Sequence, residues 1–202
     1  MIIGVLALQG AFREHAGMLK KCGIDAAEVR LPHQLDQVDG LIIPGGESTT
    51  ISKLMLEYGF PEKIKEFASS GKPVFGTCAG LIVLANKLQG KRQALLNLID
   101  IDVKRNAYGR QIESREVDLP FEFLGGGPFR TVFIRAPQIE NIGPGVKALA
   151  WYQKKVIAAR QNNILVCAFH PELAGDSRIH QYFIEMVKET KAKGKTIPSS
   201  DS

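Results

Sequence analysis

The sequence has few cysteines, and they are poorly placed for pairing or for holding a metal ion. Cys22, Cys78 and Cys167 are an odd number scattered over 202 residues, with no Cys-x-x-Cys pair and no Cys/His cluster at zinc-ligand spacing. This excludes a disulfide framework and a structural zinc site of the usual kinds. Scattered free thiols suit a reducing compartment, so a cytoplasmic location is expected.

The sequence also lacks a membrane-length apolar run and a basic block. The apolar stretch 1–8 is too short for a signal peptide or a membrane span and has no basic leader, so we expect a buried first strand. After Thr190 stand three lysines and one aspartate, so +2 of the net charge of +5 belongs to this end and +3 to the rest. Without a basic cluster interleaved with aromatic residues, binding to nucleic acid is not expected.

The composition, 45% hydrophobic and 23% charged, is that of an ordinary globular protein. A chain of this size can bury one substantial core. We therefore expect a single domain over residues 1–190. The polar segment 191–202 is expected to be a disordered tail.

Short apolar strands alternate with amphipathic helices in the first half of the chain. The expected strands are residues 1–8, 25–31, 40–44 and the run before Cys78, and the expected helices are 12–21, 48–58 and 61–69. In the second half, strands are expected from residue 101 and over 113–119, 131–135, 156–160 and 164–169, before a helix over 177–188. This order predicts an α/β fold with a mostly parallel, doubly wound sheet and some antiparallel strands in the second half.

The stretch 73–84 predicts a strand, a tight turn and a helix, with Cys78 at the turn. Gly76 and Gly80 would allow a sharp backbone and close packing of strand and helix. A helix N-terminus favours the thiolate of Cys78, and the N–H of Ala79 could meet an oxyanion. The alternative interpretation is that Cys78 is a small buried hydrophobic residue.

Ligands of parallel sheets bind beyond the carboxyl ends of the strands. That rule brings the loops 9–10 and 45–48 to the same edge as Cys78. The strand 164–169 ends in His170 and Glu172, a candidate base with the carboxylate that orients it. An ordinary surface loop is the alternative for this pair.

Two of these motifs resemble the nucleophile turn and catalytic pair of class I glutamine amidotransferases: Gly76-Thr77-Cys78-Ala79-Gly80 and His170-Pro171-Glu172. More narrowly, the chain is similar to the glutaminase subunit of pyridoxal 5′-phosphate synthase through Leu8-Gln9-Gly10, Glu14-His15, Pro44-Gly45-Gly46-Glu47-Ser48-Thr49, Arg105-Asn106 with Gly109 and Gln111, and Phe133-Ile134-Arg135-Ala136-Pro137. The resemblance covers about residues 1–190 and implies a flavodoxin-like fold. Arg115 stands where this pattern has an aromatic residue.

The resemblance implies hydrolysis of L-glutamine to L-glutamate and ammonia. Cys78 would attack the side-chain amide and form a glutamyl thioester. His170 would act as acid and then as base, oriented by Glu172, and the N–H groups of Gly46 and Ala79 would form the oxyanion hole. The ammonia would pass to a synthase (lyase) partner in a heteromeric complex. No cofactor, metal or membrane is implied.

The family's glutamine site maps onto Gly46, Glu47, Ser48, Arg105, Ile134 and Arg135. Arg105 or Arg135 would pair with the substrate carboxylate, although either could be a solvated surface arginine. The resemblance places Gln9, Glu14 and His15 toward the partner, with Gln9 ordering the oxyanion loop once the partner docks. A polar helix start facing water is the alternative for all three.

The remaining histidines and cysteines are expected to have no chemical role. His33 and His180 are interpreted as solvated or capping residues, and Cys22 and Cys167 as structural.

Two other functions use the same residues. One is another cysteine hydrolase of the same superfamily, such as a γ-glutamyl hydrolase or a peptidase. The other is a non-catalytic member that binds a partner or senses a metabolite.

Overall fold

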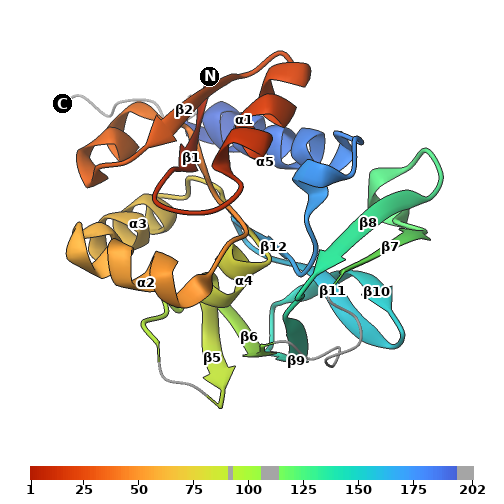
Figure 1. The fold of residues 1–202 in the computed structure, drawn as a ribbon. Coiled ribbons are helices and arrows are strands. Elements are labelled where there is room, and N and C mark those ends of the chain that lie inside the picture. The colour runs from red at the N-terminus through yellow and green to blue at the C-terminus, as the bar shows by residue number, and fades with distance from the viewer. Residues whose placement is uncertain (91–92, 106–113, 195–202) are drawn as a thin grey trace.

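The computed structural model describes residues 1–90, 93–105 and 114–194. In this part of the chain, the central sheet has seven strands in the order β10-β11-β12-β4-β3-β1-β2 (Figure 1). Their bounds are β1 (Ile2–Leu6), β2 (Asp25–Val29), β3 (Gly40–Ile43), β4 (Val74–Thr77), β10 (Lys147–Tyr152), β11 (Lys155–Gln161) and β12 (Ile164–Cys167). From β2 to β12 the neighbours are parallel, and β11 and β10 continue the sheet antiparallel. The predicted α/β class with a mostly parallel sheet is confirmed.

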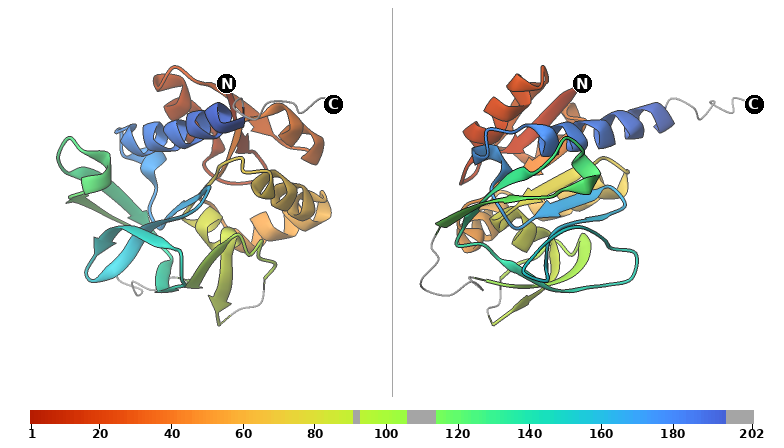
Figure 2. Two further views of the ribbon diagram at one scale, coloured as in Figure 1. Left: turned by 180° about the vertical axis from the view of Figure 1, so that it is seen from behind. Right: turned by 90° about the vertical axis from the view of Figure 1, so that its right-hand side faces the viewer.

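Helices cover both faces of this sheet. On one face lie α1 (Phe12–Lys21) and α5 (Arg178–Gly194), and on the other lie α2 (Ser48–Glu57), α3 (Phe60–Ser69) and α4 (Ala79–Leu84) (Figures 1 and 2). The alternation of side chains along β4 shows the two layers. Phe75 packs its ring against His15, His180 and Phe183 of α1 and α5, whereas Gly76 faces α4. Thr77, two residues after Phe75, therefore faces α1 and α5 as well.

Glycines let α4 lie directly on the sheet, as the sequence predicts. A methyl group on Gly80 would collide with the carbonyl oxygen of Ile43, and one on Gly76 would lie 2.7 Å from the carbonyl carbon of Gly80. Close contact between backbones at this point needs residues without a Cβ atom. The N-terminus of α4 is thereby held at the edge of the sheet where β3 and β4 end.

The second half of the chain adds smaller sheets beside the main one. The strands β5 (Ala85–Gln89), β6 (Ile99–Lys104) and β9 (Gln138–Ile142) form one, and β7 (Ser114–Leu119) and β8 (Phe129–Ile134) form another. Short 3₁₀ helices are η1 (Pro32–Gln37), η2 (Glu122–Leu124) and η3 (Pro171–Leu173). The sequence did not predict β5, β9 or β10. The strands β5 and β9 are short segments that pair with β6, and β10 forms a hairpin with β11 in which a bulge interrupts the alternation of side chains.

The C-terminal boundary differs from the prediction. Helix α5 continues past the expected end at Lys188 to Gly194, so residues 191–194 are helical rather than a disordered tail. Lys191 Nζ forms an ion pair with Asp39 Oδ1 at 2.8 Å, and Asp39 directly precedes β3. This contact holds the end of α5 near the start of β3. Residues 195–202 lie outside the described residues. No helix in the described part of the chain combines the length and apolar character that crossing a membrane requires.

Candidate active site

Four adjacent parallel strands end at one edge of the sheet, and the loops that follow them meet there. The segment 9–10 follows β1, 45–48 follows β3, Cys78 follows β4 and His170 follows β12. A Cβ atom on Gly45 would collide with the ring of His170 and would lie 3.3 Å from Cβ of Cys78. The side chains of Cys78 and His170 therefore both lie against Gly45. This agrees with the expectation that loops at the carboxyl ends of parallel strands come together.

Cys78 occupies a strained turn between β4 and α4. Its φ of 47° and ψ of −100° are unusual for a residue with a side chain. Its N–H donates to the carbonyl oxygen of Cys167 at 2.9 Å, and its Sγ lies 3.8 Å from the carbonyl oxygen of Ile134. Such strain costs about 1–3 kcal/mol and is typical of positions that present a nucleophile.

His170 and Glu172 form a buried pair. His170 Nδ1 lies 2.7 Å from Glu172 Oε1, and the two residues are 8% and 6% exposed. Burial lowers the pKa of His170, but hydrogen bonds and charges from Cys78 and Glu172 outweigh it and raise the pKa to about 10. The imidazolium is therefore favoured next to the cysteine. This burial contradicts the alternative of an ordinary surface loop.

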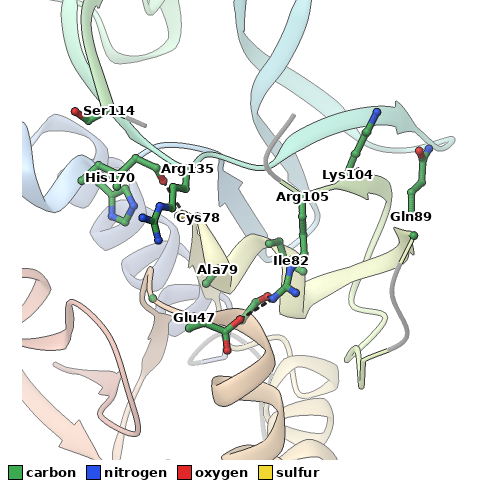
Figure 3. A pocket seen from close by; sticks show the side chains of 14 residues that line it. Glu47, Cys78, Ala79, Ile82, Gln89, Lys104, Arg105, Ser114, Arg135 and His170 are labelled. Carbon is green, nitrogen blue, oxygen red and sulfur yellow. Dashed lines mark hydrogen bonds and ion pairs between the residues drawn. The ribbon is translucent and has the colours of Figure 1, made fainter. Parts of the chain in front are cut away.

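A cavity of about 980 Å³ opens over this edge. It is lined by Cys78, Ala79 and His170 together with all six residues expected to bind glutamine: Gly46, Glu47, Ser48, Arg105, Ile134 and Arg135 (Figure 3). The sequence missed five other lining residues, Ile82, Gln89, Gly90, Lys104 and Ser114. Most of these five come from β5, β6 and the start of β7, whose approach to the site has no local sequence signal.

Arg105 and Glu47 are joined across the cavity. Arg105 Nη2 donates to Glu47 Oε1 and to Thr49 Oγ1, each at 2.9 Å, and also to the Ser48 hydroxyl (Figure 3). Glu47 caps α2, because its carboxylate accepts from the N–H groups of Thr49 and Thr50 at 3.1 and 2.7 Å. Ser48 lies inside the first turn of α2 and is buried.

Glu47 is held in its ionised form. Burial raises its pKa, but hydrogen bonds from Thr50 and Thr49 lower it to about 2. The cavity therefore presents one carboxylate together with the guanidinium groups of Arg105 and Arg135. Arg135 has a φ of 45°, so a second strained residue with a side chain borders the cavity beside Cys78.

Gln9 contacts the loop after β3 within this chain. Its Oε1 accepts from the N–H of Glu47 at 2.8 Å, and a side chain on Gly46 would collide with it. This hydrogen bond forms within the single chain, and the ordering of this loop by Gln9 when a partner docks stays a prediction.

Other expectations concern residues at the edge of the site. Glu14 is exposed on α1, but His15 is fully buried and cannot contact a partner directly, so its predicted interface position is wrong. His180, expected to be solvated or capping, is also fully buried. Arg115 lies over the ring of Tyr152 at 5.6 Å, a cation–π contact.

The motif residues Asn106, Gly109 and Gln111 lie outside the described residues. Within the described ranges, the His, Cys, Asp and Glu side chains form no group that could hold a metal ion.

Comparisons with known proteins agree with one another. Residues 5–189 match the model of the SNO glutamine amidotransferase family. The chain is 55% identical over 188 residues to the pyridoxal 5′-phosphate synthase subunit PdxT of Desulforamulus reducens, covering 93% of this chain and 100% of that protein. It is also 55% identical over 185 residues to the subunit of the same name from Pelotomaculum thermopropionicum, covering 92% and 94%. A crystal structure of a glutamine amidotransferase is similar with a TM-score of 0.89 and 47% identity, covering 93% of this chain and 100% of that one.

Proposed function

The chain belongs to the SNO glutamine amidotransferase family, and we propose that Cys78, His170 and Glu172 carry out its hydrolysis of L-glutamine. The observation that carries this assignment is the convergence of the three side chains at one strand edge, under an open cavity. Cysteine, histidine and carboxylate in this order form a known apparatus for attack on an amide carbonyl. The resulting ammonia passes to the synthase subunit that makes pyridoxal 5′-phosphate.

The first half of the reaction releases ammonia. The Cys78 thiolate attacks the side-chain amide carbon, and the oxyanion is met by the N–H groups of Gly46 and Ala79. The protonated His170 donates a proton to the leaving nitrogen, and the C–N bond breaks. The pKa of about 10 keeps His170 protonated for this step at neutral pH, and Glu172 stabilises that charge.

The second half releases glutamate. His170, now neutral, removes a proton from water, and the hydroxide attacks the glutamyl thioester. The C–S bond breaks, the thiolate of Cys78 is restored, and His170 is again the imidazolium. The hydrogen bond from His170 Nδ1 to Glu172 keeps Nε2 directed toward the cavity in both halves.

The charged groups of the cavity suit the amino-acid end of glutamine. Arg105 and Arg135 are placed to bind its carboxylate and the ionised Glu47 its ammonium group, with Ser48 and Ile134 completing the wall.

Truncating either cavity arginine should weaken glutamine binding. Arg105→Ala and Arg135→Ala should each raise KM about 10- to 100-fold with a smaller change in kcat, because a charge-assisted hydrogen bond is lost far from the reacting amide. Steady-state glutamate release measures both parameters. Arg130→Ala is the matched control, since that exposed arginine pairs with Glu116 and Asp118 outside the cavity. An unchanged KM in both cavity variants would remove these arginines from the binding site.

The synthase partner should stimulate the reaction. The isolated chain should release glutamate slowly, and adding its cognate synthase subunit should raise the rate, with exposed Glu14 and half-buried Gln9 nearest to the contact. Glutamate release measured with and without the partner tests this, and full turnover by the isolated chain contradicts it.

Both subunits should be recovered from the cytoplasmic fraction, because a thiolate nucleophile needs a reducing compartment.

A further inference from the structure

Two buried histidines adjoin the pair of His170 and Glu172 on the side of Glu172. His15 comes from α1 and His180 from the first turn of α5, and both are completely buried. His15 Nδ1 lies 2.9 Å from His180 Nε2. On its other side, His15 Nε2 lies 3.1 Å from Thr77 Oγ1 and 3.3 Å from Glu172 Oε2. The proposed reaction gives neither histidine a task.

Both histidines are neutral. Burial, followed by the charges of His180 and His170, lowers the pKa of His15 well below its ordinary value. Burial lowers the pKa of His180 to about 4. At neutral pH each imidazole therefore has one N–H donor and one bare nitrogen acceptor, and the neighbours decide which nitrogen holds the proton.

The carboxylate of Glu172 places the proton of His15 on Nε2. Oε2 of Glu172 is buried and accepts no hydrogen bond from the described residues, and His15 Nε2 approaches it to 3.3 Å. A bare nitrogen facing a carboxylate oxygen would be repelled, whereas an N–H shared between Glu172 and Thr77 satisfies both oxygens. Buried carboxylates without a donor are costly.

The environment of His180 leads to the same assignment. If His15 holds its proton on Nε2, its Nδ1 must accept from Nε2–H of His180. This leaves Nδ1 of His180 as the bare nitrogen, and within the described residues that atom has no partner. The opposite arrangement would bury an N–H without an acceptor, which is rarer and more costly than a buried unused acceptor.

We propose that His15 is a positioning residue that holds Oε2 of Glu172, so that Oε1 stays aligned with His170, and that His180 selects the required tautomer of His15. This inference rests on the proposed function, because it acts through Glu172. The chain of donors runs from His180 to His15 to Glu172, so each hydrogen bond polarises the next toward the carboxylate.

The test compares three substitutions of His15 in the full chain with its synthase subunit. His15→Leu removes the donor and should lower kcat about 10- to 100-fold with little change in KM. His15→Gln keeps an N–H near the position of Nε2 and should retain kcat within about threefold. The side chain in His15→Asn is too short to place an N–H there, so its kcat should fall as in His15→Leu. Equal activity of the Gln and Asn variants, or an unchanged kcat in all three, overturns the proposal.

The pH profile separates positioning from simple destabilisation. The titratable groups facing Glu172 are His15, His170 and the buried thiol of Cys167. A loosened Glu172 stabilises the imidazolium of His170 less, so the alkaline limb of kcat should move to lower pH in His15→Leu and return in His15→Gln. A purely structural role would reduce the amount of active enzyme without moving that limb.

A double-mutant comparison shows whether His15 acts through the carboxylate. In a Glu172→Gln background, His15→Leu should change kcat less than about twofold, because the group it holds is already altered. A full additional loss would contradict the proposal. If Cys78→Ser retains glutaminase activity, the proposed function itself is wrong. If Cys78→Ser is inactive but His15→Leu is fully active with an unchanged pH profile, only this inference fails.

Discussion

Replacing Cys78 with serine should abolish release of glutamate from glutamine, with kcat/KM falling by at least about a thousandfold. The hydroxyl of serine occupies the same strained turn but is far harder to ionise than a thiol. Serine also lacks the thiolate whose hydrogen bond and charge raise the pKa of His170, so the ion pair that supplies the nucleophile does not form. The measurement is glutamate release by the complex with its synthase subunit, at saturating and at low glutamine.

Cys22→Ser is the matched control for this prediction. Cys22 is a free, half-buried thiol at the end of α1, away from the cavity, so its replacement should leave the rate unchanged. A substantial rate in Cys78→Ser would remove Cys78 from the mechanism.

A glutamine-mimicking electrophile should label Cys78, and protection by glutamine would count against a non-catalytic binding protein. Preference for γ-glutamyl peptides over free glutamine would indicate another hydrolase.

Replacing Glu172 with glutamine should have the second-largest effect, lowering kcat by about a thousandfold or more with little change in KM. Both oxygens of Glu172 face histidine nitrogens, at 2.7 Å for His170 and 3.3 Å for His15. An amide can offer its oxygen to only one of them, and it does not stabilise the charge that His170 gains. His170 therefore loses both its orientation and part of its proton affinity, so the alkaline limb of kcat should also move to lower pH.

The control for this substitution is Glu185→Gln, an exposed position on α5 where the carboxylate pairs only with Lys188 among the described residues. It should leave kcat and its pH dependence unchanged. Retention of most of the activity in Glu172→Gln would show that His170 needs no carboxylate partner. The proposed positioning role of His15 would then also be wrong, because it acts through Glu172.

The first half of the fold could be predicted closely from local patterns. The expected helix 12–21 is α1, and the expected strand 40–44 differs from β3 by one residue. These elements have strong periodicity and clear stop signals, so local sequence is enough. The strands β5 and β9 could not be predicted in this way, because each becomes a strand only when β6 supplies the hydrogen bonds. The strand β10 pairs with its neighbour β11 in a hairpin, but a bulge interrupts the alternation of its side chains.

In the candidate site, too, some residues could be predicted from local sequence and others only from tertiary packing. Cys78, His170 and Glu172 stand in short motifs at the ends of apolar strands, and parallel strands bring such ends together regardless of detail. His15 stands in the Glu14-His15 motif, but that motif does not indicate a contact with Glu172, and His180 stands in no motif. Each is a single polar residue on an amphipathic helix, and only the packing of α1 against α5 decides that both are buried and in contact, with His15 beside Glu172.

By itself, the sequence determined the class of fold and the family and predicted the nucleophile with its base and acid, because these depend on residue types in local patterns. Only the tertiary structure decided that Glu47 caps α2 while paired with Arg105, that Gln9 contacts the loop after β3, and that His15 and His180 are buried against each other with His15 beside Glu172. The physical reason is that burial, hydrogen-bond partner and protonation state are set by what packs against a side chain, and those neighbours come from segments far apart in the chain.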